Sequence, residues 1–280
     1  MASQTRVPVS LARSTWRIFD MSLVQMLWSR RSVFLALVVG GPVALAFGIR
    51  VLAGLSSVGL PIVNGATVTG PSLFGLMIWL LYIRFILPIL GVFYGTALIA
   101  DEVEDKTITY LFTRPIPRSA VLLGKYLAYL VCTVLLVLPS VVVVYFIIVP
   151  LGGGSIGEEF PVLAADIGML ILGLATYGAL FAFVGARLKR PLVIGLIFAF
   201  GWEPGVQIFP GSVKQATIVY YMQALIPQTM PNDSAIGGLI QLFNEVPTLG
   251  ASLATLFGVT AVTLFLAGRA VQKREFVLDQ

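Results

Sequence analysis

Charged residues and histidine are the two residue classes that this 280-residue sequence most lacks. Lys, Arg, Asp and Glu make up 11% of the chain, whereas a soluble domain carries about 25%. Hydrophobic residues make up 58%. Four windows contain no charge and are each long enough to cross about 30 Å of hydrocarbon as a helix: 51–83, 126–157, 167–186 and 246–268. This composition predicts an all-α polytopic membrane protein and excludes soluble enzymes, nucleic-acid binders and disordered scaffolds.

The absence of histidine also excludes several kinds of membrane enzyme. Zinc proteases with a His-Glu-x-x-His helix, Ser-His dyads and His-dependent acyltransferases all need an imidazole. Cys132 is the single cysteine, so it has no disulfide partner within the chain. No acid, base and nucleophile set can be assembled from the remaining residues. We therefore expect no catalytic residue, no metal site and no cofactor in this chain.

Apolar runs separated by turn and charge signals predict six membrane-spanning helices, at 32–54, 79–100, 120–149, 162–187, 191–202 and 249–268. The fifth run is short, because its residues rise only about 18 Å before Glu203-Pro204 interrupts it. Before the first span, residues 11–29 combine apolar residues at roughly helical spacing with charges, and Trp16 and Trp28 suit the headgroup region. We expect an interfacial helix there; an ordinary cytoplasmic tail is the alternative.

The distribution of basic residues predicts the topology. Fifteen of the 18 Lys and Arg residues lie before the first span, between the second and third, between the fourth and fifth, or after the last. The segments on the opposite side, 55–72, 150–161 and 203–248, contain only one basic residue, Lys214. Because basic loops stay in the cytoplasm, both termini are predicted to be cytoplasmic, in a multi-pass protein of the plasma (inner) membrane. An even number of crossings follows, so the short run after Pro191 is expected to cross as a broken helix shielded by neighbouring protein.

Four small residues along the fourth span allow close helix approach. These residues are Gly168, Gly173, Gly178 and Gly185. They allow either close packing of helices inside the chain or a subunit interface.

The longest cytoplasmic loop has the pattern of a short amphipathic helix. Four carboxylates within 101–105 suit a helix N-terminus, where the macrodipole favours negative charge. Ile108, Leu111 and Phe112 follow at helical spacing and form one apolar face, and Pro115 ends the helix. Such a stripe is a docking surface for another protein or, alternatively, rests on lipid.

A motif in this loop resembles the signature loop of ABC transporter permeases of the type-2 (ABC-2) family. It reads Glu102-x-Glu104-x-x-Thr107-Ile108-x-x-Leu111-x-Thr113-x-Pro115-Ile116-x-Arg118, and Gly124-Lys125 follow it. Lys106 stands where that family often has Gly. In that family the loop joins the second and third spans and holds a coupling helix that docks on the ATP-binding subunit. The resemblance therefore implies that one group of residues couples this chain to an ATPase: Glu102, Glu104, Thr107, Ile108, Leu111, Phe112 and Arg118.

A second match to the same family follows the fifth run. Gly201-Trp202-Glu203-Pro204 and the stretch through Phe209-Pro210-Gly211 resemble its Trp-Glu-x-x and Leu-Pro-x pattern. In the family, short helices re-enter the outer leaflet here before the sixth span. The resemblance extends over the whole chain and implies one permease domain, 1–280, made up of a cytoplasmic and interfacial segment at 1–31, a coupling loop at 101–119 and an extracytoplasmic segment at 203–248.

The sequence has no Gly-x-x-x-x-Gly-Lys-Ser/Thr motif, so the chain is not expected to hold ATP itself. The resemblance implies a separate ABC ATP-binding subunit with ATP and Mg, a second permease subunit in a homo- or heterodimer, and no nucleic-acid partner. The leading prediction is the permease subunit of an ATP-driven ABC transporter, an exporter of an unidentified substrate. An ion-gradient-driven secondary carrier is the alternative, which the scarcity of intramembrane carboxylates and the lack of an inverted repeat disfavour.

Three charged residues in or near the spans are candidates for the transport pathway or its gate. Arg84 would contact a substrate or an anion, or would lie near the outer boundary and extend to water. Asp166 would pair with Arg84 or lie at the interface. Glu203 would mark the end of the fifth span, gate the outer opening or hold the re-entrant turn.

Overall fold

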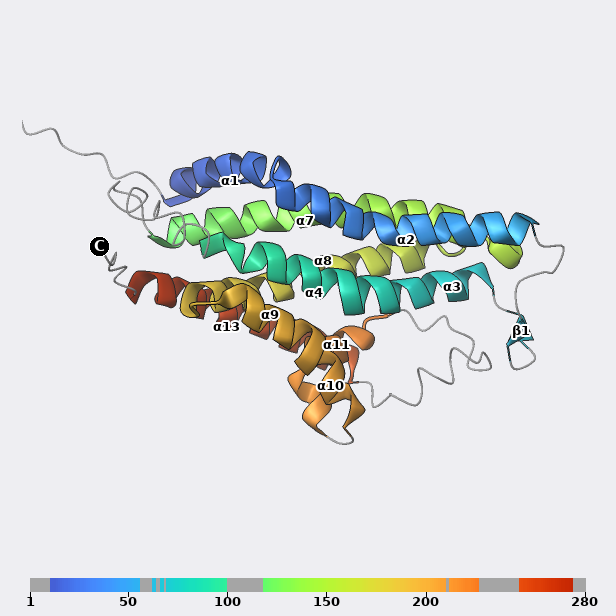
Figure 1. Ribbon diagram of the computed structural model, residues 1–280. Coiled ribbons are helices and arrows are strands. Elements are labelled where there is room, and N and C mark those ends of the chain that lie inside the picture. The colour runs from blue at the N-terminus through green and yellow to red at the C-terminus, as the bar shows by residue number, and fades with distance from the viewer. Residues whose placement is uncertain are drawn as a thin grey trace, which may run out of the picture.

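Helices form most of the part of the chain that the computed structural model describes, which comprises residues 11–55, 62–63, 66–67, 69–99, 118–209, 212–226 and 247–273. The long helices run roughly along one axis and form a bundle (Figure 1). Five helical stretches are long and apolar enough to cross a membrane: Arg31–Leu55, Gly70–Ile99, Ala120–Ile148, Phe160–Arg187 and Leu249–Gln272. The predicted all-α polytopic architecture is confirmed for the described residues, apart from one pair of two-residue strands.

The first half of the chain contributes α1 (Leu11–Leu27), α2 (Arg30–Leu55) and the antiparallel strands β1 (Ile62–Val63) and β2 (Ala66–Thr67). One continuous helix follows, made up of α3 (Gly70–Met77), η1 (Ile78–Ile86), α4 (Leu87–Leu90), η2 (Gly91–Gly95) and the residues up to Ile99. The second half contributes α7 (Arg118–Ile148), η3 (Leu151–Gly153), α8 (Phe160–Arg187), α9 (Pro191–Ile197), η4 (Phe198–Trp202), α10 (Glu203–Ile208), η5 (Ser212–Ala216), α11 (Ile218–Gln223) and α13 (Leu249–Lys273).

The predicted start of the second span, at 79, was wrong. The helix begins at Gly70, and Pro71 lies in its first turn. Proline is tolerated there because the N–H groups of the first turn have no intrahelical acceptor in any case. The uncharged, largely apolar residues before Trp79 therefore belong to the same helix.

The same helix widens into π-helical turns in two places, η1 and η2. The turn between them, α4, contains Pro88. Proline donates no backbone hydrogen bond and its ring crowds the preceding turn of an α-helix, whereas π-helical turns shift the hydrogen-bond pattern and are frequent at functional sites. η1 carries Arg84.

Hydroxyl groups connect the long helices inside the bundle. The hydroxyl groups of Tyr82 on η1 and Ser140 on α7 lie 2.7 Å apart, and Ser140 donates to the carbonyl oxygen of Val39 on α2 at 2.8 Å. Tyr129 on α7 donates to the carbonyl oxygen of Leu174 on α8 at 2.9 Å. Because a buried hydroxyl without a partner costs free energy, these bonds favour one relative position of the helices.

Three of the four predicted small residues in α8 allow close packing within the chain. At Gly173, Gly178 and Gly185 an added Cβ atom would overlap atoms of neighbouring elements. At Gly178 the overlap is with the ring of Tyr129 on α7. Gly168 has no heavy atom within 4 Å of its Cβ position. Internal packing therefore accounts for Gly173, Gly178 and Gly185 but not for Gly168.

The N-terminal helix α1 packs against the first part of α7 (Figure 1). Gly124 makes this approach close, since a Cβ atom there would lie 2.7 Å from the carbonyl oxygen of Thr15 and 3.0 Å from Cβ of Ile18. Trp16 and Met21 are exposed on α1. The apolar exposed side chains suit a lipid surface, and the placement of α1 on the inner leaflet stays a prediction.

Candidate functional site

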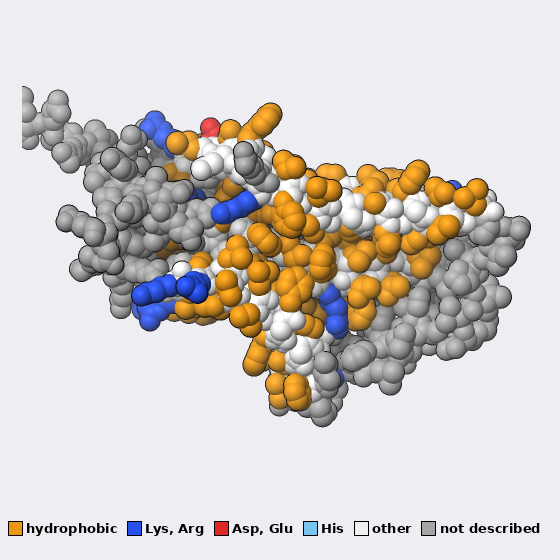
Figure 2. All heavy atoms as spheres, in the orientation of Figure 1, with side chains coloured by type: hydrophobic (Ala, Val, Ile, Leu, Met, Phe, Trp, Pro, Cys, Tyr) orange, Lys and Arg blue, Asp and Glu red, His pale blue; other side chains and the backbone are white. Residues whose placement is uncertain are grey.

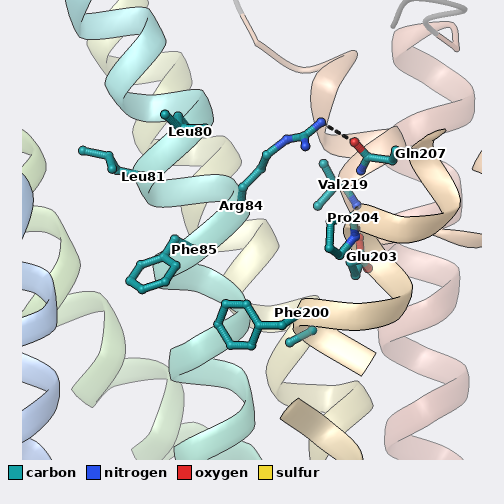
Figure 3. A pocket seen from close by; sticks show the side chains of 10 residues that line it. Leu80, Leu81, Arg84, Phe85, Phe200, Glu203, Pro204, Gln207 and Val219 are labelled. Atoms are coloured by element: carbon teal, nitrogen blue, oxygen red, sulfur yellow. Dashed lines mark hydrogen bonds between the residues drawn. The ribbon is translucent and has the colours of Figure 1, made fainter. Parts of the chain in front are cut away.

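A cleft of about 370 Å³ lies between η1 and the helices that follow α9 (Figure 3). Its lining residues come from η1 on one side and from η4, α10 and α11 on the other: Leu80, Leu81, Arg84, Phe85, Ala199, Phe200, Glu203, Pro204, Gln207 and Val219. Arg84, Glu203 and Gln207 are polar, and the others are apolar. Three polar side chains therefore share an otherwise apolar cleft.

The second wall of the cleft is a helical hairpin that reverses direction part-way along the bundle. α9, η4 and α10 form a continuous helical stretch from Pro191 to Ile208, so the prediction that Glu203-Pro204 ends the helix was wrong. Pro204 follows directly after the π-helical turn η4, and the local change of hydrogen-bond pattern there accommodates a residue without a backbone N–H. η5 and α11 follow, and Figure 1 shows α10 and α11 well short of the end of the bundle where β1 lies.

Glu203 holds this hairpin together. Its Oε1 accepts a hydrogen bond from the backbone N–H of Ile218 at 3.0 Å, and its Oε2 accepts one from the N–H of Val219 at 3.3 Å. These N–H groups belong to the first turn of α11, where they have no intrahelical acceptor and where negative charge is favoured. The Glu203 side chain is only 2% exposed. Each carboxylate oxygen therefore accepts one hydrogen bond from the backbone of α11.

Arg84 reaches across the cleft from η1 to α10. Its Nη2 donates a hydrogen bond to Oε1 of Gln207, as Figure 3 shows. Its Cζ lies 4.4 Å from the centre of the Trp79 ring, in a cation–π contact. Two further donors, Nε of Arg84 and Nε1 of Trp79, are buried and have no hydrogen-bond acceptor in the structure. Beside the cleft, two N–H donors thus have no bonded acceptor among the described residues.

The charge of Arg84 has no direct counter-ion within the described part of the chain. Glu203 is close enough to attract it through space, but the carboxylate oxygens bond to amides instead. The group that accepts a hydrogen bond from the guanidinium is the neutral amide of Gln207. A cation in apolar surroundings is costly unless a negative group approaches it. The cleft therefore favours an anionic group close to Arg84.

The apolar walls of the cleft continue onto the outer surface. Leu80, Phe85 and Phe200 line the cleft and are each more than two-fifths exposed. The Phe85 and Phe200 rings meet edge to face with their centroids 5.8 Å apart. Figure 2 shows apolar side chains over the middle of this side of the molecule and basic side chains mainly toward the end where α13 ends. The cleft thus opens on an apolar surface.

The structure brings together two of the three predicted pathway residues. Arg84 and Glu203 line the cleft from opposite walls, whereas Asp166 lies in α8 and is not among the lining residues. Asp166 is 2% exposed, and its Oδ1 has no hydrogen-bond partner in the structure. Asp166 is thus a buried residue, and in the described structure it does not pair with Arg84.

Most of the predicted ATPase-coupling residues lie outside the described residues: Glu102, Glu104, Thr107, Ile108, Leu111 and Phe112. Arg118 is the first residue of α7, and its side chain also lies outside the described part. Their role in coupling stays a prediction. Among the described residues, no three His, Cys, Asp or Glu side chains form a group that could hold a metal ion.

Sequence reasoning missed Gln207 and Trp79 as members of the site. Gln207 follows Glu203 by four positions, and this spacing places both on one face of a helix; the signal was lost because the helix was expected to end at Glu203. Trp79 precedes Arg84 by five positions. That spacing brings two side chains near one face in a π-helical turn but not in an α-helix, so the π-helical segment η1 was needed to find the contact.

Comparison with protein families identifies one match that covers most of the chain. The model of the family described as ABC-2 family transporter protein matches residues 12–267, which include the cleft, four of the five long helices and most of the fifth. Comparison with curated proteins gives no match.

Proposed function

The chain belongs to the ABC-2 transporter family, and we propose that it is the membrane-spanning permease subunit of an ATP-driven exporter whose ATPase is a separate chain. The observation that carries this proposal is the family match over residues 12–267, which coincides with a bundle of long apolar helices. The sequence has no phosphate-binding loop of its own. ATP and Mg would therefore be held by a partner subunit.

Two permease subunits, identical or related, would form the transport unit with two ATPase subunits. The permease would cross the membrane six times, with the helical stretch from Pro191 to Ile208 as the fifth and shortest crossing and the hairpin of α10 and α11 within the outer leaflet. Two observations support this topology. Basic residues gather at the end of the bundle where α8 and α13 end, as the positive-inside rule requires of a cytoplasmic end. The hairpin stops part-way along the bundle.

The loop 101–118 would transmit the movement of the ATPase. It lies between two long helices, because one long helix runs through Ile99 and another, α7, begins at Arg118. The helix through Ile99 also carries Arg84 and so forms one wall of the cleft. Closure of the ATPase subunits would push the loop, tilt both helices and open a path between the two permease subunits. A wall of the cleft would then move relative to the hairpin of α10 and α11.

Copurification and reconstitution test this function. Native protein should carry an attached ATPase, and proteoliposomes that contain both chains should hydrolyse ATP and move substrate together. A chain that transports alone under a proton or sodium gradient would show a secondary carrier instead. The Leu111 and Phe112 substitutions described in the Discussion test the coupling loop separately.

A further inference from the structure

The hydrogen-bond groups beside the cleft show which kind of ligand it fits. Nε of Arg84 and Nε1 of Trp79 are buried donors without acceptors, and the guanidinium lies over the Trp79 ring. The carboxylate of Glu203, which is the one carboxylate among the lining residues, accepts its hydrogen bonds from two backbone N–H groups of α11. Buried polar groups are normally satisfied. The guanidinium of Arg84, which is half-buried and lines the cleft, is therefore the group that a ligand with acceptor oxygens would meet.

The charge at the site selects an anion among such ligands. The hydrogen-bond acceptor of Arg84 is the neutral Gln207, and Glu203 acts on the guanidinium through space. Hydrogen bonds to an ionised group are about twice as strong as neutral ones, and guanidinium geometry matches phosphate and carboxylate oxygens. A phosphate, sulfate or carboxylate headgroup fits this arrangement.

The surroundings of the cleft determine how such an anion arrives. Leu80, Phe85 and Phe200 form partly exposed apolar walls at the opening. A free inorganic anion would have to lose its hydration and pass an apolar surface to reach Arg84. An amphipathic anion would instead keep its chain on the apolar walls while its headgroup meets the guanidinium.

We propose that the cleft between η1 and α10 binds the anionic headgroup of a membrane amphiphile, with its hydrocarbon chain along Leu80, Phe85 and Phe200. This inference rests on the proposed function only in naming the substrate class: the cargo of the transporter is an amphipathic anion that enters from the lipid. Arg84 supplies the charge, Gln207 holds the guanidinium toward the cleft, and Glu203 keeps the second wall in place.

Photolabelling of the full chain in phosphatidylcholine nanodiscs tests the proposal without nucleotide or ATPase. The probe is a phosphatidylglycerol with a photoreactive acyl chain, present as a minor lipid, and labelled residues are mapped by mass spectrometry. Label should concentrate on 79–85 and 199–219, and unlabelled phosphatidylglycerol should compete for it where phosphatidylcholine does not. Equal competition by inorganic phosphate would show a site for free anions, and label spread evenly over the lipid-facing helices would show no site; either result overturns the proposal.

Substitutions of Arg84 test the role of its charge. Arg84→Gln should lower the label in the cleft by about tenfold, since it removes a charge-assisted hydrogen bond, while Arg84→Lys should retain most of it. Arg50→Gln is the matched control, because Arg50 is an exposed basic residue of α2 outside the cleft. Undiminished labelling of folded Arg84→Gln protein would overturn the proposal.

A pair of substitutions at Leu80 keeps the test decisive if Arg84→Gln does not fold. Leu80 lines the cleft four residues before Arg84. Both Leu80→Glu and Leu80→Lys remove an apolar contact of the chain, but Leu80→Glu should lower labelling much further, because its carboxylate pairs with Arg84 and repels the headgroup whereas the lysine attracts it. Equal labelling of both variants would contradict an anion site. In the unmodified protein, absence of cleft labelling while the ATPase is still attached would overturn this inference alone. Absence of any attached ATPase would overturn the proposed function and leave the labelling result unaffected.

Discussion

The carboxylate of Glu203 accepts a hydrogen bond from the backbone N–H of Ile218, at an Oε1 to N distance of 3.0 Å, although the two residues are 15 positions apart. With the neighbouring bond to Val219, this contact ties α10 to α11. It holds one wall of the cleft, in which the Glu203 carboxylate bonds to amides of α11 while the Arg84 guanidinium bonds to the amide of Gln207. The charge of Arg84 consequently lies beside the cleft without a bonded counter-ion in the described structure.

Replacement of Glu203 should destabilise the hairpin. Glu203→Ala leaves two buried N–H groups without acceptors and should cost about 2–4 kcal/mol of stability, whereas Glu203→Gln keeps one side-chain oxygen as acceptor and should cost less. Thermal unfolding of the purified protein measures the difference, and Glu158→Ala, at an exposed residue, is the control. Equal stability of Glu203→Ala and the unmodified chain would contradict the capping role.

The glycines of α8 should differ sharply in their tolerance of alanine. Gly178→Ala forces a methyl group into the ring of Tyr129 and should cost about 1–3 kcal/mol. Gly168→Ala meets no neighbouring atom within 4 Å and should be neutral or slightly stabilising, because alanine is the better helix former. A comparison of the unfolding temperatures of the Gly178→Ala and Gly168→Ala proteins tests this expected difference in stability. Similar values for both variants would mean that α7 and α8 do not approach each other as described.

The coupling loop should bind the ATPase through its apolar stripe more than through its charges. Leu111→Ala/Phe112→Ala should cost on the order of 2–4 kcal/mol of binding if both side chains are central anchors, whereas exposed pairs formed by Glu102 or Glu104 usually contribute under about 1 kcal/mol each. The double variant should reach the membrane but lose its ATPase, and transport and stimulated ATP hydrolysis should fall together. Full complex formation and full transport by this variant would show that the stripe is only a lipid-facing helix.

The topology can be tested by cysteine labelling. The background is Cys132→Ala, since Cys132 is the single cysteine and is buried. Cysteines introduced at 60 and 240 should react with an impermeant reagent added outside, because those segments are predicted to be external. A cysteine at 105 should react only after the membrane is permeabilised. The reverse pattern would invert the orientation and place the loop 101–118 away from any cytoplasmic ATPase.

The sequence by itself determined the helical membrane architecture and pointed to the family. Long charge-free runs satisfy their backbone groups in hydrocarbon as helices, so five of the six predicted spans could be located without tertiary information, although the start of the second was wrong. The family followed from local spacing in the loop 101–118, and the match over 12–267 bears it out. The role of that loop in coupling is still a prediction.

Only the tertiary structure decided how the charged residues are used. The contact of Trp79 with Arg84 depends on π-helical turns in η1, which a proline nearby favours but a sequence pattern does not specify. The bonds from Glu203 to the first turn of α11 require the chain to reverse after Ile208 and bring back residues 15 and 16 positions away. Which oxygens remain free to meet Arg84 depends on that long-range geometry, because a hydrogen bond forms only between groups that packing has brought within about 3 Å of each other.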